Sequence, residues 1–364
     1  MPPPSTRLPL IDALRGIAAL SVVLYHIYIL DLLPHARAPF AEPAHTALSS
    51  GYLGVYIFFV VSGFVIAHSI RDARITPGFI GRFALRRSLR LDPPYWAAIA
   101  LAILAATVGI HDGARPSVSF GVVAAHLLYV QQFLGIPHLI GVFWTLCLEI
   151  QFYLAYVLLM CAVQQRSNDR PWPVFGPVWL LSLAVAARLL HVRYAVFLWA
   201  WPYFFLGVIT AWHHERRISS RAWALVTGAT SLILLGSHSR WISADDAPAR
   251  TSIIAATTLA LFLAGRVRRG DRSLLQTLTL GRPLQYLGRI SYSLYLTHVL
   301  VCAAVARLGL PLLGHPALGL LDLITLLLAC VVLSVGVAHL MHIAVERPAQ
   351  RLSRRVRLRD PDRG

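Results

Sequence analysis

Long apolar segments recur along the chain, separated by short polar stretches that are rich in arginine. A helix that crosses a bilayer needs about 20 mostly apolar residues, so the pattern predicts about ten transmembrane helices. They lie at residues 9–30, 50–70, 92–110, 142–163, 174–191, 194–212, 222–238, 251–266, 286–307 and 318–342. The apolar stretch 118–135 is interrupted by His126, Gln131 and Gln132, so we expect one re-entrant or interfacial helical segment there.

Composition and charge also indicate an all-α polytopic membrane protein. Hydrophobic residues make up 57% of the 364 residues and charged residues only 13%, whereas soluble domains carry roughly 25% charged residues. The formal net charge is +17, and all 33 basic residues are arginines. The arginines cluster in alternate loops, which argues against nucleic-acid binding and predicts a cytoplasmic (inner) membrane protein with both termini in the cytoplasm.

The segments predict one membrane domain with short ends. Residues 1–8 form a short N-terminal lead, residues 9–348 the transmembrane domain, and residues 349–364 a basic cytoplasmic tail. An arginine-rich tail of this kind is attracted to an anionic membrane surface. The four cysteines lie in apolar segments without zinc spacing or a disulfide framework, so we interpret them as buried apolar side chains.

Arg15 and His26 bracket ten mostly apolar residues of the first predicted helix. Eleven helical steps bring the two side chains to one face within roughly 20°, about 16 Å apart along the axis. Ionisable residues inside a membrane are costly and are therefore functional candidates. Alternatively, Arg15 extends to lipid headgroups and His26 bonds a neighbouring helix, but their shared face favours a functional pair.

Three arginines, Arg86, Arg87 and Arg90, precede the third predicted span in the sequence RRSLRLDPPYW. A guanidinium group binds phosphate through a bidentate fork, so the cluster predicts an anionic cytosolic ligand. For any single arginine, the positive-inside signal is the simpler explanation. The density of the cluster favours ligand binding.

Glu149 lies about two turns into apolar sequence, with Tyr153 one turn further along the same face. A buried carboxylate needs a partner, and His26, an arginine or a tyrosine can serve. Trp144 lies about 140° away on the helix and is interpreted as an interfacial anchor or gate. Ser62 lies deep in the second predicted span, where helix packing through small residues is the alternative to a functional role.

Ser291, Tyr295 and His298 form a polar stripe on one face of the span at 286–307. Such a stripe faces protein or a water-filled cavity, and interhelical hydrogen bonding is as plausible as function. Two histidines and a glutamate at positions 339, 342 and 346 also share a helix face. Nothing else in the sequence completes a ligand set there, so no metal site is predicted.

In combination and in order, these motifs resemble the acyltransferase-3 family of integral membrane O-acyltransferases. The resemblance rests on Arg15 and His26 and on the stretches GVYIFFVVSGF (54–64), RRSLRLDPPYW (86–96), FWTLCLEIQFY (143–153), WPYFFLGV (201–208), LGRISYSLYLTH (287–298) and VERP (345–348). The family moves acyl groups, usually acetyl, from cytosolic acyl-coenzyme A to hydroxyls of carbohydrates or other acceptors. The chain ends soon after VERP, so the resemblance implies the stand-alone form without an SGNH-type domain.

The resemblance assigns roles to the candidate residues. His26 would be the catalytic histidine, with Glu149 and Tyr153 in the catalytic group. Arg15, Arg86, Arg87 and Arg90 would bind acyl-coenzyme A, whereas Ser62, Trp144, Tyr295 and His298 are candidates for acceptor binding or gating. Neutral His26 would act as general base, Glu149 would orient its imidazolium, and an acyl-histidine intermediate stays open.

Two other functions stay open at this stage. One is acylation of a small secondary metabolite such as a macrolide, and the other is a proton-coupled permease. The sequence implies no tightly bound cofactor, only acyl-coenzyme A as co-substrate, and it leaves the acyl chain, the acceptor, the side of transfer and the oligomeric state undetermined.

Overall fold

The computed structural model describes residues 9–29, 47–110, 118–167, 169–190, 197–240, 247–269, 281–313 and 319–358. This part of the chain is helical and contains no strand, which confirms the expected all-α class. The elements are α1 (Pro9–Ile29), η1 (Ser50–Tyr52), α3 (Leu53–Ser69), α4 (Pro77–Thr107), α5 (Phe120–Leu127), α6 (Phe143–Arg166), α7 (Trp172–Ala186), α8 (Trp201–His214), α9 (Ser220–Arg240), α10 (Ala247–Arg269), α12 (Arg282–Leu313), α13 (Leu320–Met341), the π-helical η3 (His342–Glu346) and α14 (Arg347–Ser353). Position 30 and the expected lead 1–8 lie outside the described residues.

Six helices are long and apolar enough to cross a membrane: Pro9–Ile29, Ala47–Ser69, Pro77–Thr107, Phe143–Arg166, Arg282–Leu313 and Leu320–Ser353. The expected total of about ten spans is therefore not confirmed. Apolar composition does not show where turns interrupt a segment. Residues 197–200 form a turn, so α8 has only 14 residues. The stretch 118–135 contains α5, which at eight residues is too short to cross a bilayer.

Helix α4 begins well before the apolar segment that predicted it. The Thr76 side chain caps it by accepting a hydrogen bond from the backbone N–H of Phe79 at 3.2 Å. Hydropathy marks only the part of a helix that is apolar, so it does not predict the arginine-rich first half of α4. Pro93 and Pro94 lie inside the helix, and the Tyr292 hydroxyl donates to the carbonyl of nearby Leu91 at 2.9 Å.

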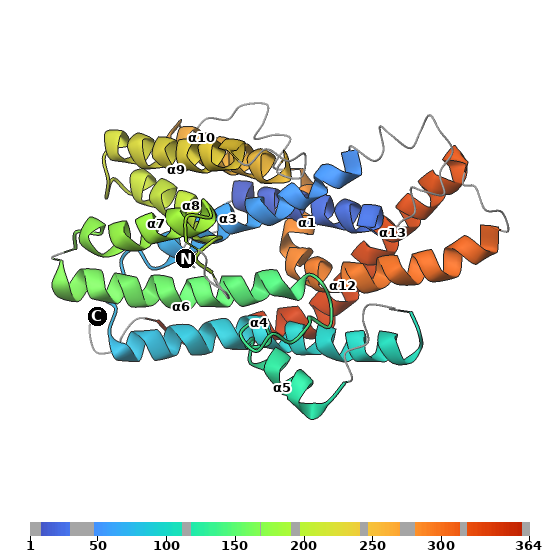
Figure 1. The fold of residues 1–364 in the computed structure, drawn as a ribbon. Helices are drawn as coiled ribbons and strands as arrows, with labels where there is room; N and C mark the ends of the chain where they lie inside the picture. The colour runs from blue at the N-terminus through green and yellow to red at the C-terminus, as the bar shows by residue number, and fades with distance from the viewer. Residues whose placement is uncertain are drawn as a thin grey trace.

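Helix α1 lies in the middle of the molecule, between α12 and α3 (Figure 1). Helix α3 packs in turn against α8, and α12 against α13. The long helices α6 and α4 lie below them in this view, and α9 and α10 lie above. The start of the expected tail forms α14, which packs against α4. This arrangement places α1, with Arg15 and His26, among the predicted functional segments.

Glycines allow α1 to approach both neighbours closely. A Cβ atom on Gly288 of α12 would overlap the carbonyl oxygen of Asp12 on α1. A Cβ atom on Gly16 would lie 2.7 Å from the carbonyl oxygen of Leu284. On the opposite side, a Cβ atom on Gly54 would overlap the Ala18 carbonyl oxygen. Backbone contact at these glycines therefore fixes the register of α1 against α12 and α3.

We expect Gly288→Ala to destabilise the protein by about 1–3 kcal/mol, because the added methyl group meets backbone that cannot move independently. The measurement is the thermal midpoint of the purified protein in detergent. Gly336→Ala is the matched control, since among the described residues no atom of another helix lies within 4 Å of its Cβ position. That control should not lower the midpoint, because alanine favours helix over glycine. Equal midpoints for the two variants would contradict the packing argument.

Candidate active site

Arg15 is held at the contact between α1 and α12. Its side chain is half-buried, and its Nε donates a hydrogen bond to Ser291 Oγ at 3.2 Å. Ser291 is fully buried and donates in turn to the Gly288 carbonyl at 2.9 Å. The first residue of the predicted polar stripe is therefore a partner of Arg15.

His26 faces the same helix further along. Its Nδ1 lies 2.9 Å from the carbonyl oxygen of Val22 and 3.1 Å from Nε2 of His298. The two imidazole rings meet edge to face, with centroids 4.8 Å apart. The structure thus brings together the second residue of the predicted α1 pair and the last residue of the polar stripe.

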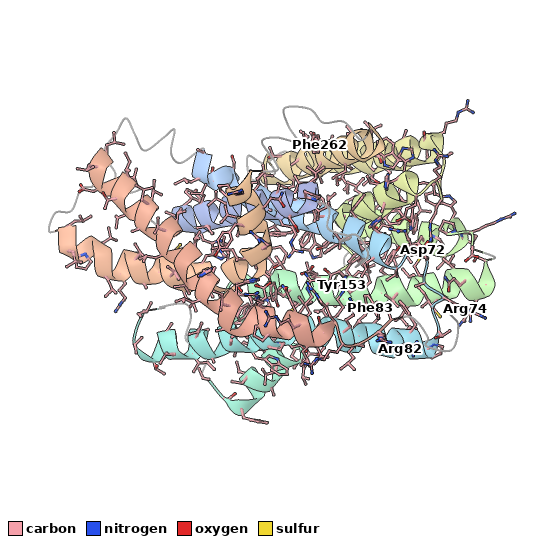
Figure 2. The ribbon with its side chains drawn as sticks, turned by 180° about the vertical axis from the view of Figure 1, so that it is seen from behind. Asp72, Arg74, Arg82, Phe83, Tyr153 and Phe262 are labelled. Carbon is pink, nitrogen blue, oxygen red and sulfur yellow. The ribbon has the colours of Figure 1, made fainter. Side chains whose placement is uncertain are left out.

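Glu149 lies in a separate group formed by α3, α4 and α6. Ser62 Oγ donates to Glu149 Oε1 at 2.8 Å, and the Tyr153 hydroxyl donates to the same oxygen. The Arg87 guanidinium lies over the Tyr153 ring, 4.4 Å from its centroid, and 5.5 Å from the centroid of Phe83. Figure 2 shows Tyr153 and Phe83 near each other between α6 and α4. Glu149, Tyr153, Ser62 and Arg87 therefore form one cluster.

Of the candidate partners of Glu149, the structure supplies the tyrosine, and among the described residues no hydrogen bond joins Glu149 to His26. The two groups are instead joined through Tyr295. Its ring centroid lies 5.8 Å from that of His298, and its hydroxyl lies 2.7 Å from Thr145 Oγ1, one turn before Glu149 on α6. The helical period placed Tyr153 on the Glu149 face, but the sequence could not identify Ser62 as a partner, because Ser62 is 87 positions away.

Three of the four predicted donor-binding arginines lie close together. Arg90 interacts electrostatically with Arg87 and Arg15, and also with Glu346. No carboxylate lies within 4.0 Å of Arg15, Arg87 or Arg90 within the described residues. Half-buried like charges without close counter-ions favour the binding of an anion. The three arginines therefore form a candidate anion site at the junction of α1 and α4.

Arg86 differs from these three arginines because it also reaches the C-terminal segment. Its Nη1 donates to the Val356 carbonyl at 3.5 Å, and it interacts electrostatically with Arg354. Both partners lie in the C-terminal segment that follows α14. The structure therefore links Arg86 to the packing of that segment against α4, alongside its interaction with Arg87.

Trp144 contacts other aromatic residues and lies outside the Glu149 cluster. Its ring centroid lies 6.3 Å from that of Phe59 and 5.8 Å from that of Trp199. This agrees with the helical geometry, which places Trp144 and Glu149 on different faces of α6.

Glu346 was assigned no role from the sequence, yet it is 3% exposed and fully bonded. It accepts from Ser293 Oγ at 2.6 Å and lies 2.9 Å from His342 Nδ1, while Gln350 donates to its other oxygen at 2.8 Å. The neighbouring His339 contacts Tyr286 instead. No group of three metal-ligating side chains occurs among the described residues. The sequence feature that pointed to Glu346 was its place in the VERP stretch (345–348), one of the motifs that carry the family resemblance.

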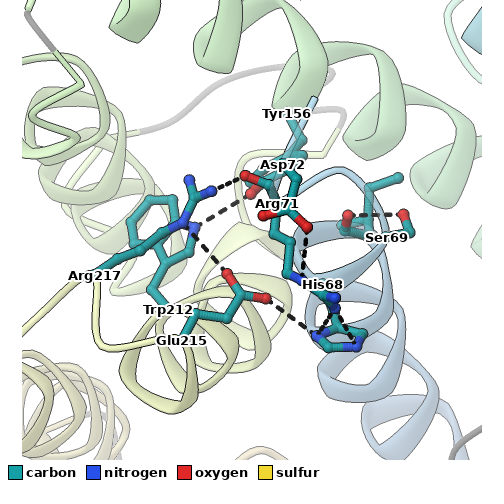
Figure 3. A network of polar contacts seen from close by, with 9 residues as sticks. His68, Ser69, Arg71, Asp72, Tyr156, Trp212, Glu215 and Arg217 are labelled. Carbon is teal, nitrogen blue, oxygen red and sulfur yellow. Dashed lines mark hydrogen bonds and ion pairs between the residues drawn. The ribbon is translucent and has the colours of Figure 1, made fainter. Parts of the chain in front are cut away.

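A second polar network joins the end of α3 to the end of α8 (Figure 3). His68 Nδ1 lies 3.1 Å from Glu215 Oε1, and Arg217 Nε lies 3.4 Å from Glu215 Oε2. Arg71 Nη1 lies 2.8 Å from His68 Nε2, and Arg217 donates to the Arg71 carbonyl. This network, which no sequence motif predicts, holds the connection that leads into α4.

Comparison with known proteins tests the resemblance directly. The acyltransferase-3 family model, described as an acyltransferase domain, matches residues 8–342. The acyltransferase MdmB of Streptomyces mycarofaciens is 28% identical, over 97% of this chain and 94% of that protein. Nodulation protein 10 of Rhizobium leguminosarum bv. viciae is 28% identical, over 82% of each chain. No solved structure matches the chain significantly.

The family model covers nearly the whole described region, from α1 to the first residue of η3. It therefore includes every residue of the anion site, the histidine pair and the Glu149 cluster. The chain belongs to the acyltransferase-3 family and is an acyltransferase.

Proposed function

We propose that this protein is a membrane-bound O-acyltransferase that transfers an acetyl group from acetyl-coenzyme A to a hydroxyl of a carbohydrate or glycolipid acceptor. The observation that carries the proposal is the arrangement along α1. A site for anions surrounds Arg15 at one end, and a histidine lies on the same face eleven residues later. The separation of about 16 Å suits a donor with a phosphate-bearing head and a long narrow arm.

In this mechanism Arg15, Arg87 and Arg90 bind the phosphates of coenzyme A, and the pantetheine arm extends along α1 toward His26. The neutral imidazole removes the proton of the acceptor hydroxyl as its oxygen attacks the thioester carbonyl. The tetrahedral intermediate then collapses, the carbon–sulfur bond breaks, and the proton passes from the imidazolium to the departing thiolate. The products are the acetyl ester and free coenzyme A.

The acceptor is proposed to approach from the end of α1 that lies beyond His26, where aromatic side chains gather. The Tyr25 ring lies 5.5 Å from that of His26 and 5.9 Å from that of Tyr52. Tyr56 follows on α3, with its ring 4.7 Å from Tyr203. Aromatic faces that also carry hydroxyl groups suit stacking against a sugar ring and hydrogen bonding to it. The partly exposed rings of Tyr25, Tyr52 and Tyr56 support a carbohydrate acceptor, whereas Tyr203 is buried.

The protein is proposed to reside in the cytoplasmic membrane with both termini in the cytoplasm. The support is the concentration of arginine between alternate apolar segments, which includes the first half of α4 with Arg86, Arg87 and Arg90. This orientation places the proposed donor site next to the cytosolic pool of acyl-coenzyme A.

Acceptor-dependent release of coenzyme A tests the proposed function. The purified protein in lipid nanodiscs is supplied with acetyl-coenzyme A and a panel of carbohydrate and glycoside acceptors, and free thiol is measured together with product mass. We expect thiol release only with a suitable acceptor, matched by one acetyl ester per thiol. Reconstituted vesicles that move a labelled acceptor without releasing thiol from any acyl-coenzyme A would contradict this function and support the permease.

A further inference from the structure

The two histidines at the contact between α1 and α12 are each held by their own helix. His26 Nδ1 lies 2.9 Å from the Val22 carbonyl oxygen, and His298 Nδ1 lies 3.0 Å from the Leu294 carbonyl oxygen. A carbonyl oxygen only accepts, so each Nδ1 must carry the hydrogen. A neutral imidazole has one N–H group, and Nε2 of both rings therefore carries a lone pair.

His298 presents that lone pair to His26. Its Nε2 lies 3.1 Å from His26 Nδ1, so the His26 N–H is shared between the Val22 carbonyl and the His298 ring. His298 is fully buried, whereas His26 is partly exposed. Both of these contacts of His26 involve Nδ1, so they leave its Nε2 available.

We propose that His298 is a positioning residue for His26. It fixes the ring orientation with the basic Nε2 directed away from α12, and it stabilises the positive charge that His26 gains when Nε2 takes a proton. The hydrogen bond strengthens at that moment, because bonds from a charged donor are roughly twice as strong as neutral ones. The proposal rests on the proposed role of His26 as general base.

No proton moves to His298 in this scheme. The acceptor proton goes to His26 Nε2 and later to the thiolate, while the hydrogen on His26 Nδ1 stays in place between Val22 and His298. The buried partner is neutral, so it orients the base without converting it to imidazolium before the reaction. A third group that orients the base is a recurring part of acyl-transfer sites, and here it is supplied by α12 rather than by Glu149.

Two conservative variants separate this role from a structural one. The amide of glutamine reaches the position of histidine Nε2, so His298→Gln keeps an acceptor for His26. The amide of asparagine reaches the position of Nδ1, so His298→Asn keeps the bond to Leu294 and loses the one to His26. If the role of His298 is purely structural and only the bond to Leu294 matters, His298→Asn should be more active than His298→Gln.

The readouts are steady-state kinetics and the tautomer of His26. We expect His298→Asn to lower kcat about 10- to 100-fold with donor KM within about twofold, and His298→Gln to retain at least about a third of kcat. Nitrogen-15 shifts of labelled histidine, assigned by subtracting the spectrum of His26→Gln, should show His26 protonated at Nδ1 in the wild type. Thermal midpoints check that each variant folds.

The proposal fails if His298→Asn is as active as wild type, or if a folded His298→Gln is as inactive as His298→Asn. It also fails if His26 in the wild type carries its hydrogen on Nε2. The spectroscopic result needs no substrate. If the wild type transfers no acyl group to any acceptor, the general-base function fails, and the tautomer still decides whether His298 orients His26.

Discussion

Replacing His26 with alanine is expected to reduce acceptor-dependent coenzyme A release by about 100- to 10,000-fold, the usual contribution of a general base. The variant lacks the imidazole nitrogen that takes the proton of the acceptor hydroxyl. Donor affinity should change little, since Arg15 and Arg87 contact Ser291 and Tyr153 and do not contact His26. The measurement is thiol release at saturating acetyl-coenzyme A, with donor affinity measured separately by calorimetry.

His26→Gln is the companion variant, because alanine leaves a space beside His298 that could disturb packing. Glutamine fills part of that space and retains a polar group, but its amide is not a base. Both variants should therefore be inactive while they bind the donor and melt near the wild-type temperature. Activity of His26→Gln within about tenfold of wild type would remove His26 from the chemical step.

Features that depend on one helix could be predicted from the sequence. The period of the helix placed Arg15 and His26 on one face, and the structure confirms that both contact α12, through Ser291 and His298. The same argument separated Trp144 from the Glu149 face. These predictions hold because the geometry of a regular helix does not depend on what surrounds it.

Features that depend on contacts between helices could not be predicted. His26, an arginine and a tyrosine were all candidate partners of Glu149, and the structure pairs Glu149 with Tyr153. The crossing of α1 and α12 at Gly16 and Gly288 places His26 beside His298. Close backbone approach at glycines sets which side chains face one another, and hydropathy carries no information about it. The expected total of about ten spans is not confirmed for a similar reason: six membrane-length helices occur among the described residues, and turns inside apolar segments leave no clear signal in composition.

The second large effect is expected at the donor site. Arg87→Ala should raise the donor KM about 10- to 100-fold and lower kcat much less, since one charge-assisted bond to phosphate contributes about 1.5–3 kcal/mol. Arg87→Lys should recover only part of the affinity, because lysine keeps the charge but lacks the bidentate fork. The measurements are the donor KM and the affinity for coenzyme A, each at two salt concentrations. The difference in affinity between variant and wild type should shrink as the salt concentration rises.

Two control variants locate the effect. Arg86→Ala removes an arginine whose side chain reaches the Val356 carbonyl, so donor KM should stay near wild type while stability falls slightly. Tyr153→Phe keeps the ring beneath the Arg87 guanidinium and removes only the hydroxyl that bonds Glu149, so donor affinity should also persist. If Arg86→Ala weakens the donor as strongly as Arg87→Ala, the cluster attracts the donor through its net charge alone. A specific phosphate site at Arg15, Arg87 and Arg90 requires that the two variants differ.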